Sequence, residues 1–416
     1  MSAIAELRAL EILDSRGNPT VQATCVLASG AAGTVSVPSG ASTGAGEAHE
    51  LRDGNPSRYG GRGCRRAVAA VEGEIAAALR GRELAGQEEL DRALLELDGS
   101  ADKSRLGANA ILAVSLAFAR ASAAELGRPL YEHFASLVGE TPDALPRPEI
   151  NLFSGGRHAG GQVAVQDVLV VPTGATTMDE ALATTADAYR SAARLVLERY
   201  GMRELTADEG GLAPDFPDTE RMLADASEAV AGLPVSLSID VAASQLRGED
   251  GYRLDGETLT GAEMVERVAR WAREHEVVAV EDGVAEDDWD DWVALRAALP
   301  AGVLAIGDDL LCTSASRIRR AVELGAADAL LLKVNQVGTL TEAAEARALA
   351  REAGWRVVVS ARSGETEDDW LADLAVGWRG DLIKIGSIRQ SERLAKYNRL
   401  LAIERETGLP LAPRLA

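Results

Sequence analysis

The chain has 416 residues, and its 65 Asp and Glu outnumber its 43 Lys and Arg, giving a formal net charge of −22. At roughly 150 residues per domain, this length predicts two or three domains. Apolar residues make up 46% and charged residues 26%, which excludes a disordered or collagen-like chain. The acidic charge argues against nucleic acid and anionic membranes as partners, because phosphate surfaces attract basic faces.

No membrane span or secretion signal is predicted. The longest charge-free stretch, 17–46, is rich in Gly, Ser and Thr, unlike a lipid-facing helix. The N-terminus reaches Glu6 and Arg8 without an apolar segment. Three widely separated cysteines, an odd number, are typical of a reducing compartment rather than of a disulfide framework. We therefore expect a cytoplasmic protein.

Lysine is rare among the basic residues. Codon bias in a GC-rich genome explains the excess of arginine, but it also makes each remaining lysine of interest. Arginine keeps its proton in proteins, whereas a buried lysine can release one. With only four histidines in the chain, we expect acid–base chemistry to depend on lysines and carboxylates. The four lysines are Lys103, Lys333, Lys384 and Lys396.

In chain order, the first part is predicted to be α+β. Apolar residues alternate with polar ones in three segments, which predicts strands separated by Gly, Asn and Pro turns. Three further segments carry apolar residues at three- and four-residue spacing, which predicts helices. The expected strands are 4–13, 21–27 and 33–37, and the expected helices are 65–79, 87–97 and 108–126.

Beyond a predicted linker at 142–148, short apolar runs alternate with amphipathic helices. Most runs end in a polar residue, and these ends recur about every 25 residues, the length of one strand plus one helix. This pattern predicts parallel β/α units in an eight-stranded TIM-like barrel over 137–416, following an N-terminal α+β capping domain over 1–136. The polar ends are Asp240, Glu281, Asp308, Lys333, Ser360 and Lys384, while Gln166 and Asp167 precede another run.

One polar strand end alone is more simply a solvated residue, but a series in register predicts an active site at one mouth of the barrel. Asp240, Glu281 and Asp308 would repel one another unless a cation neutralised them, and an all-oxygen set favours Mg²⁺ over zinc. Lys333 and Lys384 would project into the same mouth. There, a neighbouring cation and the metal would disfavour the ammonium form and produce a usable base.

Three other segments suggest substrate handling. Glu209 lies in a glycine turn, 208–211, where its carboxyl is suited to donating a proton. Arg362 and Ser363 follow a strand end and can bind a phosphate through charge and hydroxyl. Residues 38–44 are small and polar and have the composition of a lid, although a plain surface loop has the same composition.

Seven motifs resemble the enolase family, in order and with family-like spacing from about residue 4 to residue 406. They carry the resemblance together, and no single one is sufficient. The motifs are DSRGNPT (14–20), SGASTG (39–44), GANAIL (107–112), DEGG (208–211), EDG (281–283), KVNQ (333–336) and SGETED (363–368).

The resemblance implies an N-terminal capping domain, an enolase-type barrel and a Mg²⁺-dependent removal of water from 2-phosphoglycerate. It implies that Asp240, Glu281 and Asp308 hold a first Mg²⁺, and that Ser39 helps hold a second. Lys333 would take the proton from C2, and Glu209 would assist departure of the C3 hydroxyl. His158, Gln166, Arg362, Ser363 and Lys384 would bind the substrate, and Asp167 occupies a further catalytic position.

The chain departs from the family pattern inside this site. Enolases have Glu where this chain has Asp167, and His where it has Ala361. We expect both residues to line the pocket and to enlarge it, and we expect Ala361→His with Asp167→Glu to improve turnover of 2-phosphoglycerate. Further departures are Ile385 for Thr, Ala207 for Gly, Ser154 for Asn, and Ala285 at an acidic position.

Three functions therefore remain open. The first is an ordinary enolase, which makes phosphoenolpyruvate. The second is a specialised paralogue acting on a phosphonate analogue, as do the enolase-like enzymes of phosphonate and phosphinate antibiotic pathways that make carboxyphosphonoenolpyruvate. The third is a binding protein without catalysis. In each case we expect a small phosphorylated or phosphonylated carboxylate as ligand and a homodimer or higher homo-oligomer.

Overall fold

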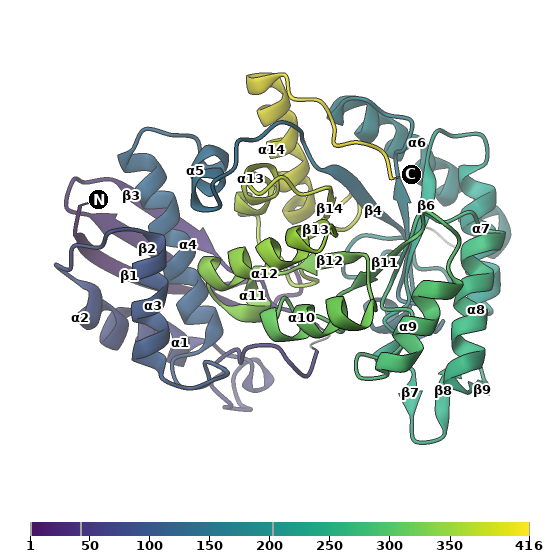
Figure 1. Cartoon of the computed structure of the whole chain (residues 1–416), viewed down its shortest axis with the longest axis horizontal. Helices are drawn as coiled ribbons and strands as arrows, with labels where there is room; N and C mark the ends of the chain where they lie inside the picture. Colours follow the sequence, from purple (N-terminus) through teal and green to yellow (C-terminus); the bar gives the residue numbers. More distant parts are fainter. Residues whose placement is uncertain (1, 42–43, 202–203, 416) are drawn as a thin grey trace.

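The computed structural model describes residues 2–41, 44–201 and 204–415, and its N-terminal part lies beside a barrel (Figure 1). The N-terminal part contains a three-stranded antiparallel sheet in the order β1-β2-β3, with helices on one side. Its strands are β1 (Ile4–Leu13), β2 (Pro19–Leu27) and β3 (Ala32–Ser36). Its helices are α1 (Arg65–Ala70), α2 (Ala76–Leu79), α3 (Gln87–Asp98), α4 (Ala108–Glu125) and α5 (Leu130–Leu137), with a π-helical turn, Val71–Ile75, joining α1 to α2.

Helix α4 forms the centre of this part. Its sequence is apolar on almost every face, so it is buried along most of its length. It packs on β2 and β3 so closely that a Cβ at Gly33 would lie 2.4 Å from the backbone nitrogen of Ala121. No single helix among the described residues is long and apolar enough to cross a membrane. Helices α4 and α5 have the necessary length and apolar composition only when taken together, and the chain bends by 113° between them.

The second part is a closed eight-stranded barrel, as the sequence predicts. Helices surround it, and the small antiparallel sheet β7-β8-β9 extends from one end (Figure 1). The barrel strands are β4 (Arg147–Ser154), β5 (Asp167–Val171), β6 (Ser236–Asp240), β10 (Ala279–Glu281), β11 (Leu304–Gly307), β12 (Ala329–Leu332), β13 (Arg356–Ser360) and β14 (Leu382–Lys384). The longer surrounding helices are α6 (Met178–Tyr200), α7 (Thr219–Val230), α8 (Gly261–Glu274), α9 (Trp289–Ala298), α10 (Ala315–Leu324), α12 (Leu340–Glu352), α13 (Trp370–Gly377) and α14 (Ser391–Thr407).

Strand β5 corrects the expectation of uniformly parallel units. It pairs antiparallel with both β4 and β6, whereas the other neighbouring strands of the barrel pair in parallel. The reason is the connections: a loop joins β4 to β5, and both α6 and α7 follow β5. Because β5 runs backwards, its first residue lies at the same mouth as the last residues of its neighbours. Asp167 is therefore in register with Ser154 on one side and Asp240 on the other.

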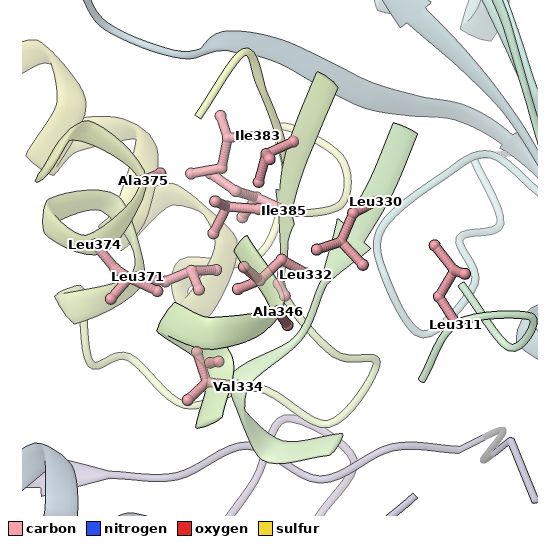
Figure 2. Packing of buried hydrophobic residues seen from close by; sticks show 14 of the residues in the cluster. Leu311, Leu330, Leu332, Val334, Ala346, Leu371, Leu374, Ala375, Ile383 and Ile385 are labelled. Atoms are coloured by element: carbon pink, nitrogen blue, oxygen red, sulfur yellow. The ribbon is translucent and has the colours of Figure 1, made fainter. Parts of the chain in front are cut away.

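Apolar side chains from the strands fill the space between barrel and helices. Figure 2 shows part of this core, where Leu332 of β12 and Ile383 of β14 lie near Leu371 and Leu374 of α13. These four side chains are 0–3% exposed. Burying side chains of this size contributes roughly 1.5–3 kcal/mol each. The polar residues that follow the same strands are thereby held in place at the mouth.

Candidate active site

The carboxyl ends of the parallel strands surround one cavity, into which the lid segment contributes Ala41. Asp240 is the last residue of β6 and Lys384 the last of β14, while Lys333 directly follows β12. Most of the substrate-binding and proton-transfer residues expected from the sequence line this cavity. Its walls are Ala41, His158, Gln166, Glu209, Asp240, Lys333, Ser360, Ala361, Arg362, Ser363, Lys384 and Ile385.

The three expected metal ligands lie at this mouth and are paired with the two lysines. Lys384 Nζ lies 2.8 Å from Asp240 Oδ2 and 2.6 Å from Glu281 Oε2. Lys333 Nζ lies 2.5 Å from Asp308 Oδ2. Two lysine ammonium groups therefore pair with three carboxylates. Counted over these five largely buried groups with all of them ionised, one negative charge is in excess.

The lysines are held in their charged form by these contacts. Burial lowers the pKa of Lys333, but the charges of Asp308 and Glu281 together outweigh it, and the pKa is raised. Burial also opposes the charged form of Lys384, yet Asp240 and Glu281 raise its pKa well above the usual value. The protein's own residues alone therefore favour ammonium, and the expectation that Lys333 is a usable base beside a bound metal stays a prediction. Releasing a proton requires that another cation take over the carboxylates.

The residues present fit a divalent cation. Glu281 is buried, and burial together with the charge of Asp240 raises its pKa well above the usual value. A carboxylate in this state lacks sufficient positive charge nearby, and an all-oxygen donor set suits Mg²⁺. Among the described residues, ligand atoms lie within 4.8 Å of one another in two groups: Asp282 with Asp308 and Asp309, and His158 with Asp167 and Glu209. The expected set of Asp240, Glu281 and Asp308 is not one of these groups, and its carboxylates contact the two lysines instead. Only Asp308 belongs both to these groups and to the expected set.

Addition of Mg²⁺ is expected to raise the melting temperature, and EDTA to reverse the effect. A ligand at a hundred times its Kd stabilises the folded state by about 2.7 kcal/mol. Asp240→Asn is expected to lose most of this shift, whereas Asp208→Asn, an exposed position outside the cluster, is expected to keep it. Calorimetric melting of the three proteins with and without Mg²⁺ makes the comparison. A full shift in Asp240→Asn would remove that residue from the metal site.

Glu209 lines the same cavity as the two lysines and lies within a chain of polar contacts. Asn151 Nδ2 donates to Glu209 Oε2 at 3.1 Å, and His158 Nε2 lies 3.8 Å from Oε1. Burial lowers the pKa of His158, but Asp167 and Glu209 outweigh it and raise the pKa to about 9. Burial raises the pKa of Glu209, but the charges of His158, Arg393 and the two lysines together outweigh it, and the pKa is lowered. A proton therefore resides on His158, beside the Glu209 carboxylate.

Asp167 corrects one expectation about the pocket. It does not line the cavity but lies behind His158, with its Oδ2 2.8 Å from His158 Nδ1. Its Oδ1 accepts a hydrogen bond from the Ser154 hydroxyl at 2.5 Å, so two departures from the family pattern contact each other. The reversed direction of β5 brings Asp167 to the mouth, where it contacts His158 rather than the cavity. By contrast, Ala361 and Ile385 do line the cavity, as expected for Ala361.

Arg362 and Ser363 form the other wall, in the loop after β13. The Ser363 hydroxyl is buried and has no hydrogen-bond partner among the described residues, so it is available to a ligand. Arg362 Nη1 contacts Glu47 Oε2 at 3.0 Å and Asn335 Oδ1 at 2.8 Å. Glu47 and Asn335 were not identified from the sequence as site residues, although Asn335 belongs to the KVNQ motif (333–336).

The remaining expected residues lie at the edges of the site. Gln166 Nε2 donates to Asp240 Oδ2 at 3.1 Å. The Ser39 hydroxyl donates to Glu50 Oε2 at 3.0 Å and accepts from Arg52 Nη2 at 2.7 Å, so the structure does not bring it to the three carboxylates. Its role toward a second ion stays a prediction. Ser42 and Thr43 of the expected lid lie outside the described residues.

A TIM-type barrel with carboxylates and lysines at its C-terminal mouth defines a class of acid–base enzymes. Comparison with known families identifies the member of this class. Residues 4–134 match the family model described as enolase, N-terminal domain, and residues 142–411 match enolase, C-terminal TIM barrel domain. The chain therefore belongs to the enolase family, and it is a lyase-type enzyme of the enolase superfamily.

Proposed function

We propose that the protein is a Mg²⁺-dependent hydro-lyase that removes water from 2-phosphoglycerate or a close analogue. The observation that carries this proposal is that Lys333, Glu209 and Arg362 line one cavity, with a carboxylate cluster at the same mouth. A base, an acid and an anion-binding group are what the elimination requires. A cytoplasmic location and a homo-oligomeric state belong to the same proposal.

Lys333 would remove the proton from C2 of the substrate. That proton is weakly acidic because its loss places a second negative charge on the neighbouring carboxylate. Asp240, Glu281 and Asp308 would hold the metal, which when bound supplies positive charge to the substrate carboxylate and competes with Lys333 for Asp308. Lys384 would add a further positive charge next to the substrate carboxylate. These charges act mainly on the intermediate, which is the condition for catalysis.

Glu209 would then complete the elimination. The C–O bond at C3 breaks as the electron pair left at C2 forms the double bond, and the departing hydroxyl takes a proton to leave as water. Glu209 would deliver that proton after receiving it from the protonated His158, whose Nε2 lies 3.8 Å from Glu209 Oε1. Asp167 and Ser154 would fix the orientation of His158 from behind. Arg362 and Ser363 would hold the phosphorus-borne oxygens.

A second candidate substrate is a phosphonate or phosphinate analogue with an additional carboxylate on phosphorus, whose product is carboxyphosphonoenolpyruvate. The observation in its favour is that Ala361, in place of the family's His, lines the cavity beside Arg362. Absence of the imidazole leaves room for a larger group, and Arg362 and Lys384 can bind its extra charge. Mg²⁺-dependent turnover of the two substrates, followed by phosphorus NMR, distinguishes them. Binding of either substrate without turnover would indicate a non-catalytic protein instead.

Ala361→His is expected to raise turnover of 2-phosphoglycerate by roughly tenfold, because one well-placed group changes substrate discrimination by about 1–3 kcal/mol. The measurement is the rise in ultraviolet absorbance of the enol product. Ala361→Leu fills similar space without polar atoms and is expected to give no gain. Asp167→Glu is best tested separately, because Asp167 lies behind His158 and the longer side chain would disturb that contact.

Turnover of 2-phosphoglycerate by the native chain at an ordinary enolase rate, with no gain in Ala361→His, would reject the paralogue and support the ordinary enolase. Absence of turnover of either substrate by the native chain in the presence of Mg²⁺ would reject both.

A further inference from the structure

Glu47 lies in the segment 44–50, which continues from the expected lid (38–44), and it joins this segment to two parts of the active site. Its side chain is 8% exposed. Its Oε2 accepts from Arg362 Nη1 at 3.0 Å, and its Oε1 accepts from Arg362 Nη2 at 3.3 Å. Oε1 also accepts from Gln336 Nε2 at 3.4 Å and from the backbone N–H of Gly44 at 3.1 Å. One carboxylate thus contacts the lid, the loop after β13 and the short helix α11 (Val334–Val337).

The contact with Glu47 sets how Arg362 is oriented. The Arg362 side chain is 3% exposed, and a buried cation is costly unless it is paired. Because a guanidinium is planar, contacts at both Nη1 and Nη2 fix the plane in which all of its N–H groups point. Asn335 Oδ1 supports the same orientation through Nη1 at 2.8 Å. The direction in which Arg362 presents its donors therefore depends on Glu47.

Glu47 itself is held by the barrel. The backbone N–H of Ala48 donates to the Gln336 carbonyl oxygen at 2.8 Å, and that of Ala45 donates to Glu286 Oε2 at 3.1 Å. Gln336 Nε2 also donates to Asp308 Oδ1 at 2.9 Å, so the same side chain contacts an expected metal ligand. The position of Glu47 is therefore tied to the residues around the metal and the base.

We propose that Glu47 is a positioning residue, whose carboxylate holds the Arg362 guanidinium in the orientation that binds the phosphorus-borne oxygens of the substrate. The proposal rests on the proposed function only in assigning Arg362 to those oxygens. A carboxylate beside an anion site repels the anion, so its contribution must come from orienting and neutralising the buried arginine. Glu47 acts through Arg362 and does not itself contact the substrate.

The test measures binding of inorganic phosphate to the full-length chain by titration calorimetry, without turnover. Glu47→Ala is expected to weaken phosphate binding roughly tenfold, the size of one lost charged hydrogen bond. Glu47→Gln keeps the shape of the side chain and one acceptor oxygen, and its phosphate affinity is expected to lie between that of Glu47→Ala and that of the native chain. In an Arg362→Ala background, Glu47→Ala is expected to cause no further loss of phosphate binding, because each change removes the same Glu47–Arg362 interaction. Glu140→Ala removes the carboxylate partner of another buried arginine, Arg347, at 2.9 Å and outside the cavity, and is expected to leave binding within about twofold.

Several outcomes would overturn the proposal. Unchanged or tighter phosphate binding in Glu47→Ala would make the carboxylate a bystander or a competitor for Arg362. An equal loss in the Arg362→Ala background would indicate a general structural effect, as would an equal loss in Glu140→Ala. If Glu47→Ala does not fold, Glu47→Gln decides, and native affinity in that variant counts against the proposal. A native chain that binds phosphate but dehydrates neither substrate would reject the proposed function and leave the role of Glu47 intact.

Discussion

Lys333→Ala is expected to abolish exchange of the C2 proton of 2-phosphoglycerate with solvent deuterium, and with it net dehydration. A general base contributes roughly 10²–10⁴-fold, and no other lysine follows the same strand to replace it. Proton abstraction precedes loss of water, so both readouts fall together. Proton NMR in deuterium oxide measures the exchange directly, and the absorbance of the enol product measures dehydration. Exchange at the native rate in Lys333→Ala would exclude Lys333 as the base.

Lys333→Arg separates proton transfer from charge. Arginine preserves the positive charge beside Asp308 but does not release its proton, so it is expected to be as inactive in exchange as alanine. Lys103→Arg is the matched control, because Lys103 is another buried lysine with a carboxylate partner, Glu342, at 2.8 Å. This variant is expected to retain activity. Recovery of exchange in Lys333→Arg would mean that the position supplies only charge.

The barrel and the residues at its mouth could be predicted because they follow a local rule. Each parallel strand ends at the same side, so a polar residue after each apolar run indicates a shared location without knowledge of long-range contacts. Asp240, Glu281, Lys333 and Lys384 meet as this rule predicts. The rule fails for Asp167, because strand direction depends on whether a helix connects two strands, and the apolar pattern of β5 does not record its direction.

The rarity of lysine drew attention to all four lysines, and two of them, Lys333 and Lys384, lie at the mouth of the barrel. The other two are structural: Lys103 pairs with Glu342, and Lys396 Nζ lies 2.9 Å from Glu365 Oε2. Both are buried, so burial of a lysine does not by itself indicate catalysis. What separates the two pairs is position relative to the strand ends, which the sequence does indicate.

Glu47 could not be predicted as part of the site, because its partner Arg362 is 315 positions away in the chain. Nothing in the local sequence of segment 44–50 distinguishes the Glu47 carboxylate from that of Glu50, which instead accepts a hydrogen bond from the Ser39 hydroxyl. Likewise, the Asp14 of the first motif serves the turn between β1 and β2, where its Oδ1 accepts from the backbone N–H groups of Arg16 and Asn18. Family motifs therefore mark both structure and chemistry.

Glu209→Gln is expected to stop dehydration while C2 exchange continues. Glutamine keeps the size and the hydrogen bond from Asn151 Nδ2 but cannot pass a proton to the leaving hydroxyl. Dehydration is expected to fall roughly 10²–10⁴-fold, the usual contribution of a general acid. Exchange depends on Lys333 and the charges beside it, so it is expected to stay within a few-fold of the native rate. The two rates, measured in one deuterated sample by NMR, give the comparison.

Asp208→Asn is the control for this change, since Asp208 adjoins Glu209 but is exposed and does not line the cavity. Both rates are expected to be native in that variant. Equal loss of exchange and dehydration in Glu209→Gln would place the carboxyl in the first step or in substrate binding, and would contradict its role as the acid. Native dehydration in Glu209→Gln would transfer that role to His158, whose Nε2 lies 3.8 Å away and whose pKa is raised to about 9 by the charges of Asp167 and Glu209, which outweigh its burial.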